Sequence, residues 1–166
     1  DPSLLDQVDK SLRDTGLHAS RLEFEITETV AMQDIERADV ILEALRQRGI
    51  RLLMDDFGTG HSSLSNLRRL PLHAVKIDRS FVKGLTRNTD VMAVIHATLM
   101  LVENLRMASV AEGVEDAAQL AVLQSLGCRY AQGYYFSPPV PADQLIRASR
   151  PLHAVNGDDG AIISAA

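Results

Sequence analysis

Short runs of β-branched and apolar residues alternate along this chain with longer segments whose apolar residues repeat at helical spacing. Such runs are typical of strands, and the longer segments are typical of amphipathic helices. The predicted strands lie at residues 22–27, 51–54, 74–77, 107–111 and 129–131. Charged or amide side chains come at or directly after the end of each run. The pattern therefore predicts about five successive strand–helix units with a polar group at each strand end.

Segments with a helical repeat separate these strands. The predicted helices lie at residues 4–15, 34–49, 90–105, 116–126 and 142–149. The apolar residues of 90–105 cover more than one stripe, so this helix either buries a second face against a partner or lies deep in the domain. The periodicity stops beyond Leu152. We therefore expect a domain at residues 1–150 and a disordered tail at residues 151–166.

Alternating strands and helices indicate an α/β fold with a parallel sheet, here part of a TIM-like barrel. A complete barrel of this type needs about 250 residues, whereas this chain has 166 residues. We therefore expect the N-terminal strands to be missing. In such a barrel the C-terminal ends of the strands converge on one face. The acidic strand-end residues are predicted to share one site there: Glu25, Glu28, Asp55, Asp56, Asp78, Glu112 and Glu115.

The strongest local signal is the pair Asp55-Asp56, followed by Phe57, Gly58, Thr59 and Gly60. Adjacent carboxylates repel each other unless cations neutralise them, and their oxygens suit hard ions such as Mg²⁺ or Mn²⁺. The alternative is a turn at the strand end, in which an aspartate accepts backbone N–H bonds and the glycines supply positive φ. The repetition of carboxylates at other strand ends favours the metal site.

Two further side chains are candidates at the same face. Lys76 alternates with apolar neighbours in its strand and would need a carboxylate partner inside a barrel, where it could orient a water or a phosphate oxygen. The alternative is a lysine that extends to solvent from an edge strand. Gln132 could bond a nucleophile or a ligand base, but by itself it fits ordinary loop chemistry better, and only its position at a strand end favours the site.

The composition limits the partners and the location. A net charge of −5 without a basic tract argues against binding of long nucleic acid, but not against a small phosphorylated ligand. The single cysteine, Cys128, excludes an intramolecular disulfide and fits a reducing cytoplasm. No apolar run is long enough to span a membrane. We expect a cytoplasmic chain, whose parent protein could still be tethered to a membrane.

Five linked motifs closely resemble the EAL family of cyclic di-GMP phosphodiesterases. They are LEFEITE at residues 22–28, MDDFGTGHSSL at 54–64, VKIDRSFV at 75–82, AEGVE at 111–115 and QGY at 132–134. The resemblance implies a TIM-like barrel that binds cyclic di-GMP and uses two Mg²⁺ or Mn²⁺ ions to hydrolyse one phosphodiester, giving linear pGpG. It also implies a role in bacterial second-messenger signalling, a homodimer, and sensory or diguanylate-cyclase-like domains in the parent chain.

By motif match the resemblance also implies a role for each residue. The metal ligands would be Glu25, Asp55, Asp56, Asp78 and Glu112. Lys76 and Gln132 would hold the attacking water, Glu28 would hold the loop of residues 57–63, and Glu115 would be an accessory acid at the rim. The predicted catalytic residues are Lys76, Glu112, Gln132 and Glu28. The residues predicted to contact the substrate or form the loop are Phe57, Gly58, Thr59, Gly60 and Glu115.

Two departures from the family pattern matter. His61 stands where the family usually has Tyr, and the Glu-x-Leu-x-Arg motif and a later Asn ligand cannot be placed in this chain. Glu43-Ala44-Leu45-Arg46 has the same letters, but it lies in the middle of a predicted helix with solvated charges. We therefore expect this chain alone to lack part of the site and to be inactive.

Two alternative functions stay open. One is a catalytically inactive cyclic di-GMP receptor, and the other is a metal-dependent lyase or enolising barrel in which Lys76 is a base.

Overall fold

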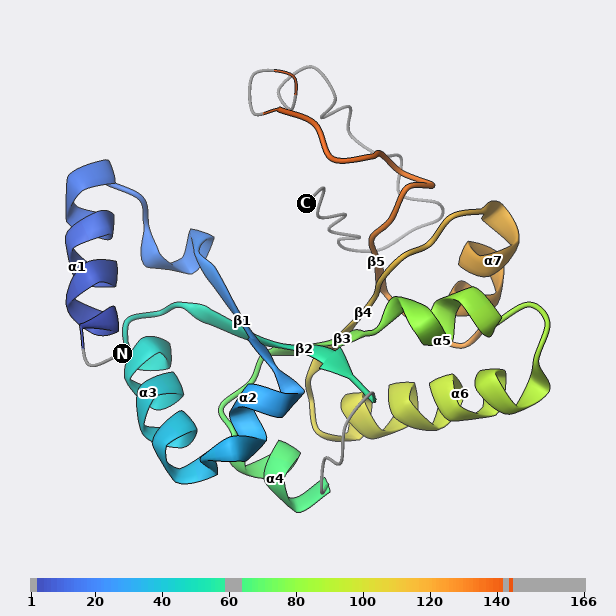
Figure 1. The fold of residues 1–166 in the computed structure, drawn as a ribbon, viewed down its shortest axis with the longest axis horizontal. Coiled ribbons are helices and arrows are strands. Elements are labelled where there is room, and N and C mark those ends of the chain that lie inside the picture. The colour runs from blue at the N-terminus through green and yellow to red at the C-terminus, as the bar shows by residue number, and fades with distance from the viewer. Residues whose placement is uncertain (1–2, 59–63, 142–143, 145–166) are drawn as a thin grey trace. The chain divides into compact units, whose positions relative to one another are not determined.

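The computed structural model describes residues 3–58, 64–141 and 144 (Figure 1). Its five strands are hydrogen-bonded in sequence order in one sheet. They are β1 (Glu23–Thr27), β2 (Arg51–Phe57), β3 (Ala74–Ile77), β4 (Ala108–Ala111) and β5 (Tyr130–Ala131). β1 and β2 run parallel, as do β4 and β5. The predicted α/β fold with a parallel sheet is confirmed, as expected for successive strand–helix units of a TIM-like barrel.

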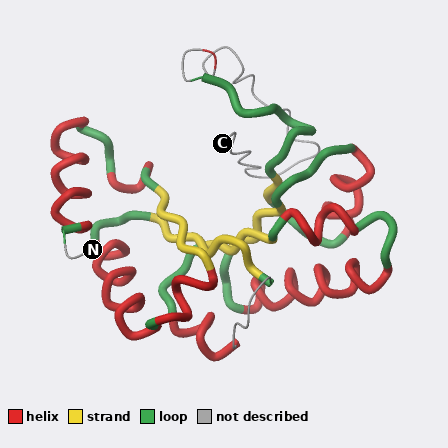
Figure 2. The backbone as a smooth tube through the Cα atoms, in the orientation of Figure 1, coloured by secondary structure: helices red, strands yellow, loops and turns green. Residues whose placement is uncertain are grey.

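Helices separate the strands along the chain (Figure 2). They are α1 (Leu4–Thr15), a 3₁₀ turn η1 (Ala19–Arg21), α2 (Glu28–Gln33), α3 (Ile35–Gln47), α4 (Leu64–Arg69), α5 (Arg79–Gly84), α6 (Thr89–Asn104) and α7 (Ala117–Ser125). The described residues form two compact units. The first lies within Asp1–Lys76 and Leu105–Met107, and the second within Ile77–Asn104 and Ala108–Ala166.

In the first unit, α2 and α3 pack against β1 and β2. The middle of β2, Leu52–Met54, is buried without the alternation of a half-exposed strand. This continuous burial is typical of a parallel strand that is covered on both faces. Leu42 and Leu45 of α3 supply buried apolar side chains to the same unit. Arg48, just after α3, forms a two-pronged ion pair with Asp9 of α1, with N–O distances of 2.7 and 2.9 Å.

Short polar residues start these helices. Thr27 accepts the N–H of Val30 at the start of α2, and Asp34 accepts the N–H of Arg37 at the start of α3. Such side chains satisfy backbone donors that have no partner within the first turn of a helix. Since α2 begins directly after β1, the backbone leaves the strand at Thr27 and turns into a helix within one residue.

In the second unit, one apolar core lies between β4, β5 and the helices α5, α6 and α7. It is formed by Ile77, Val82, Leu85, Ile95, Leu99, Ala111, Val114, Leu123, Cys128 and Ala131. One face of α6 is buried in this core, whereas Met92, Val94 and Met100 of the same helix are exposed. The wide apolar surface predicted for residues 90–105 therefore includes apolar side chains on more than one side of the helix that stay exposed at the surface of this unit.

Several predicted boundaries need correction. β2 extends through Asp55 and Asp56 to Phe57, beyond the predicted end at residue 54. α2, α4 and α5 were not predicted, because six residues make fewer than two turns and give no readable helical repeat. The predicted helix at 142–149, except for residue 144, and the predicted tail at 151–166 lie outside the described residues.

The mid-helix position predicted for Glu43-Ala44-Leu45-Arg46 is confirmed. Leu45 is buried, and Glu43 and Arg46 form an ion pair at the surface of α3, with a nitrogen–oxygen distance of 2.7 Å. The hydrogen bond from Arg46 lowers the pKa of Glu43 to about 2. Within the part of the chain that the structure describes, no helix combines the length and apolar character needed to cross a membrane.

Candidate functional site

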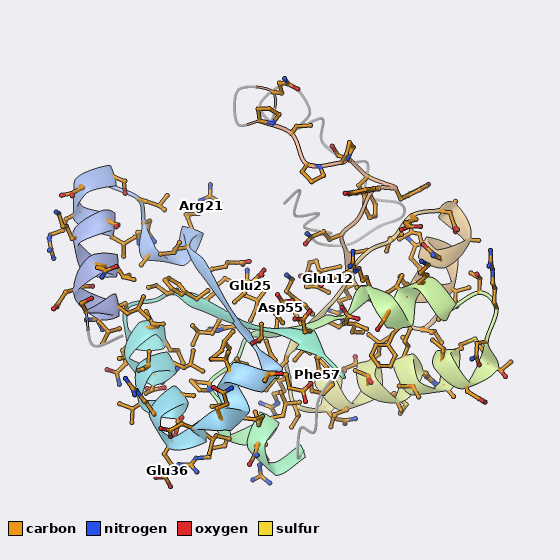
Figure 3. The ribbon with its side chains drawn as sticks, in the orientation of Figure 1. Arg21, Glu25, Glu36, Asp55, Phe57 and Glu112 are labelled. Atoms are coloured by element: carbon orange, nitrogen blue, oxygen red, sulfur yellow. The ribbon has the colours of Figure 1, made fainter. Side chains whose placement is uncertain are left out.

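Three neighbouring strands of the first unit bring a lysine and two carboxylates together. The ammonium nitrogen of Lys76 lies 2.8 Å from Oε2 of Glu25 and 3.3 Å from Oδ1 of Asp55. Figure 3 shows Glu25 and Asp55 on β1 and β2, with Glu36 of α3 on the opposite side of these strands. Lys76 is only 6% exposed. This burial contradicts the alternative of a lysine that extends to solvent, and an ammonium so buried requires carboxylate partners.

Asp55 and Asp56 are brought onto one side by a local change of backbone conformation. Successive side chains of a regular strand point to opposite faces of the sheet. Asp56 has a φ of 54°, in the left-handed region, so this alternation breaks at the end of β2. One carboxylate oxygen of each residue lies within 4.8 Å of the other. Aspartate tolerates this conformation better than most residues, so the sequence permits two neighbouring carboxylates to face one ligand.

Glu28, the first residue of α2, holds the chain that leaves β2. Its side chain is buried, with 1% exposure, and its Oε2 accepts the N–H of Gly58 at 3.0 Å. Phe57 is buried at the end of β2 (Figure 3), and Gly58 has a φ of 98°. Glu28 therefore fixes the point where the chain enters the predicted substrate loop. Thr59 and Gly60 lie outside the described residues.

In the second unit, Asp78 follows β3 and begins α5. Its Oδ1 accepts the N–H of Ser80 at 2.9 Å. Partial burial pushes the pKa of Asp78 upward, but the hydrogen bonds from Ser80 and Arg79 and the charge of Arg79 outweigh it. The pKa therefore lies below its ordinary value of 3.8. Asp78 is charged at neutral pH and has a helix-capping role in addition to its predicted place in the site.

Glu112 follows β4 in a segment that backbone hydrogen bonds hold on both sides. Its N–H donates to the carbonyl of Ile77 at 3.1 Å, and the N–H of Val114 donates to the carbonyl of Gln132 at 3.0 Å. The N–H of Gln132 in turn donates to the carbonyl of Ala111 at 2.8 Å. The structure therefore brings the backbone of the Glu112 segment beside Gln132, as the prediction of neighbouring strand ends required.

Glu115 is the last acidic residue of this segment, and a buried glutamine fixes its backbone. Oε1 of Gln119 accepts the N–H of Glu115 at 2.7 Å and that of Asp116 at 3.3 Å. Sequence reasoning missed Gln119. The signal was present, because Asp116 and Gln119 have the three-residue spacing of a capping box at the start of a helix.

The predicted residues thus fall into two groups, one in each unit. The first unit gathers Glu25, Asp55 and Lys76, with Asp56 beside Asp55, and Glu28 bonds Gly58 at the end of β2. The second unit places Asp78, Glu112, Glu115 and Gln132 after β3, β4 and β5. Carboxylate oxygens dominate both groups. Such donors favour Mg²⁺, Mn²⁺ or Ca²⁺ over soft metals, and they provide the charge that a phosphate-bound cation requires.

The chain resembles proteins of known activity. It is 43% identical over 162 residues to the cyclic di-GMP phosphodiesterase NbdA of Pseudomonas aeruginosa, which covers 93% of this chain and 21% of NbdA. The chain therefore spans about a fifth of that relative's length. It also matches a solved structure of the PaMucR phosphodiesterase in complex with c-di-GMP. That match has a TM-score of 0.83 and 43% identity, and it covers 86% of this chain and 58% of the other.

A second solved structure is the manganese and cyclic di-GMP complex of BlrP1 from Klebsiella pneumoniae. It matches with a TM-score of 0.78 and 33% identity, over 83% of this chain and 35% of the other. The family model of the EAL domain matches residues 1–139, which include every site residue discussed above. The chain therefore belongs to the EAL domain family.

Proposed function

We propose that the protein carrying this chain hydrolyses cyclic di-GMP to linear pGpG. The observation that carries the proposal is the group formed by Lys76, Glu25 and Asp55 on neighbouring parallel strands, with Asp56 beside it. Membership of the EAL family and the likeness to NbdA and to the cyclic di-GMP complex of PaMucR support it.

The donor set fits two divalent ions, Mg²⁺ or Mn²⁺. We assign Glu25, Asp55, Asp56, Asp78 and Glu112 as the residues that would hold them. A fit is supported by the left-handed backbone of Asp56, which brings two carboxylates to one side at the cost of mutual repulsion that a cation relieves. When bound, such ions lower the pKa of a water molecule and stabilise the charge that develops on the departing oxygen.

The remaining residues orient the reacting groups. Lys76, held by Glu25 and Asp55, directs its ammonium group toward the attacking water, and Gln132 accepts or donates a hydrogen bond to that same water. The water oxygen forms a bond to phosphorus, and the bond from phosphorus to one ribose 3′ oxygen breaks. The water gives up two protons, of which one goes to that oxygen, which leaves as a 3′ hydroxyl, and the other is released to solvent. The water oxygen stays on the 5′ phosphate of linear pGpG, so atoms and charge balance.

A turnover assay with a binding control tests the proposal. The full-length protein is incubated with cyclic di-GMP and saturating Mn²⁺, and the products are separated by chromatography. Formation of pGpG that disappears in the Asp55→Asn variant supports the phosphodiesterase. Calorimetric binding of cyclic di-GMP without any turnover would overturn it in favour of the receptor, and absence of both would refute cyclic di-GMP as the ligand.

We also propose that the protein forms a homodimer through the exposed apolar side chains Met92, Val94 and Met100 of α6. Exposed apolar side chains are better buried against a second copy than left in water. Light scattering of the wild type and of Val94→Lys tests the dimer. If the Val94→Lys variant still has the mass of a dimer, this interface is refuted.

The length of NbdA relative to this chain supports further domains in the parent protein.

A further inference from the structure

Gln119 is a buried polar side chain that the phosphodiesterase mechanism does not use. It is 5% exposed and lies in the first turn of α7. Its Oε1 accepts two backbone N–H groups, those of Glu115 and Asp116, and its own N–H donates to Oδ1 of Asp116 at 2.8 Å. The amide oxygen is therefore held on the segment that connects β4 to α7.

This segment, residues 112–116, carries Glu112 and Glu115. Its first half is fixed by the backbone, because the N–H of Glu112 bonds Ile77 and the N–H of Val114 bonds Gln132. Gly113 has a φ of 67°, and a Cβ at this position would lie 2.5 Å from Cβ of Arg79, so the chain runs tightly against α5 here. The second half, Glu115 and Asp116, is held by the side chain of Gln119.

We propose that Gln119 is a positioning residue for the acidic segment 112–116, and that it sets the affinity of the protein for the divalent ion held by Glu112. The inference rests on the proposed function, since it concerns the same site. Loss of a group that hydrogen-bonds to a metal ligand typically weakens metal binding by about 10- to 100-fold. Gln119 acts one step further back, through the backbone of Glu115 and Asp116, and the lower end of that range is expected.

Two substitutions separate the hydrogen bonds from the volume of the side chain. Gln119→Leu keeps a similar size but removes the acceptor, so the N–H groups of Glu115 and Asp116 lose their partner. Gln119→Glu retains acceptor oxygens and is itself a preferred residue at this position of a capping box. Gly127→Ala is the control for α7 stability, because Gly127 has a φ of 84° at the other end of the helix and a Cβ there meets no atom within 4 Å.

The test uses the full-length protein and three measurements: amide hydrogen exchange without metal, Mn²⁺ binding by electron paramagnetic resonance, and turnover as a function of Mn²⁺. For Gln119→Leu we expect faster exchange at Glu115 and Asp116 and about a 10-fold weaker Mn²⁺ binding, with kcat at saturating Mn²⁺ reduced much less. Gln119→Glu should keep the slow exchange at Glu115 and Asp116 and the Mn²⁺ affinity of the wild type. Gly127→Ala should leave the Mn²⁺ affinity unchanged.

Unchanged Mn²⁺ affinity in a folded Gln119→Leu variant would overturn the proposal, as would an equal loss in Gly127→Ala, since that would indicate helix stability alone. If Gln119→Leu fails to fold, the exchange and affinity of Gln119→Ala take its place, with the same two outcomes. Hydrogen exchange and Mn²⁺ binding do not depend on hydrolysis. A wild-type protein without turnover would therefore refute the proposed function, while these two measurements would still decide the role of Gln119.

Discussion

The carboxylate of Glu28 accepts a hydrogen bond from the N–H of Gly58, at 3.0 Å and thirty residues away in the sequence. It joins the first turn of α2 to the residue that follows β2. Because Glu28 is buried, its charge has to be compensated within the fold, and the amide of Gly58 contributes to that compensation. The entry to the substrate loop thus depends on a residue from the preceding strand–helix unit.

Glu28→Ala is expected to increase hydrogen exchange at Gly58 and to reduce turnover, because the freed amide loses an interaction of about 1–3 kcal/mol. Glu28→Gln is the matched control, since its amide oxygen can accept the same bond at similar volume. Exchange is followed by NMR or mass spectrometry. Unchanged protection of Gly58 in Glu28→Ala would show that Glu28 does not hold this position.

Substitutions of Asp56 can separate the effect of its negative charge on turnover from the effect of its backbone conformation on stability. Asp56→Asn keeps a residue that tolerates the left-handed φ of 54°, so it should fold normally and lose turnover. Asp56→Ala should in addition lower the free energy of unfolding by about 1 kcal/mol, because alanine adopts this conformation less readily. Asp55→Asn should also abolish turnover. Urea unfolding and pGpG formation distinguish these effects, and near-normal rates in both Asn variants would refute the assignment of metal ligands.

Lys76 is expected to be required for turnover but not for binding of cyclic di-GMP. Lys76→Met should reduce kcat by about 100-fold or more, as the attacking water loses the group that orients it. Lys76→Arg should not restore the rate, because the planar guanidinium group cannot occupy the same position between Glu25 and Asp55. Steady-state kinetics and calorimetry measure the two properties. A rate in Lys76→Arg close to the wild type would contradict a specific role of the ammonium group.

His73 makes the stability of the first unit depend on pH. Its Nδ1 accepts the N–H of Leu52 at 3.1 Å, which requires an unprotonated nitrogen. Burial, followed by the charges of Arg51 and Arg46, lowers the pKa of His73 below its ordinary value of 6.5. The unfolded chain therefore takes up the proton more readily. The stabilisation is complete above pH 6.5 and is lost as the pH falls toward and through the folded-state pKa.

His73→Asn should flatten the pH dependence of stability, because an amide oxygen can accept the same N–H and does not titrate. Thermal unfolding of the wild type and the variant, from about pH 7.5 to about pH 5, is the measurement. Parallel curves for the two proteins would show that His73 does not control the acid sensitivity.

Gly133→Ala should destabilise the second unit strongly. Gly133 has a φ of 154°, and a Cβ there would lie 2.3 Å from both the nitrogen and the oxygen of Val114, which are backbone atoms that cannot move aside. Gly127→Ala provides the comparison, since it introduces only the backbone strain of a left-handed residue, about 1–2 kcal/mol. Equal losses in the melting temperatures of the two variants would refute the steric explanation.

The sequence predicted the strands well because a parallel strand leaves a compact apolar run, as at Ala74–Ile77, whose bounds agree with the structure. It shortened β2, because Asp55 and Asp56 interrupt the apolar run and hide a strand that continues to Phe57. The sequence predicted that the partners of Lys76 are carboxylates. Their identity and distances depend on strand pairing that a single sequence does not contain. The hydrogen bond of His73 to Leu52 has no sequence signal, because imidazole rings replace backbone acceptors too rarely to form a pattern.

Burial of Cys128 has a practical consequence for spectroscopy. The single cysteine of the chain lies in the core of the second unit, and desolvation raises the pKa of its thiol. Only the thiolate reacts readily with maleimides and related reagents, so Cys128 stays unlabelled in the folded chain at neutral pH. A cysteine introduced at Met100 or Tyr134, both exposed, would therefore take up a spin label or a fluorophore at one defined position without prior removal of the native thiol.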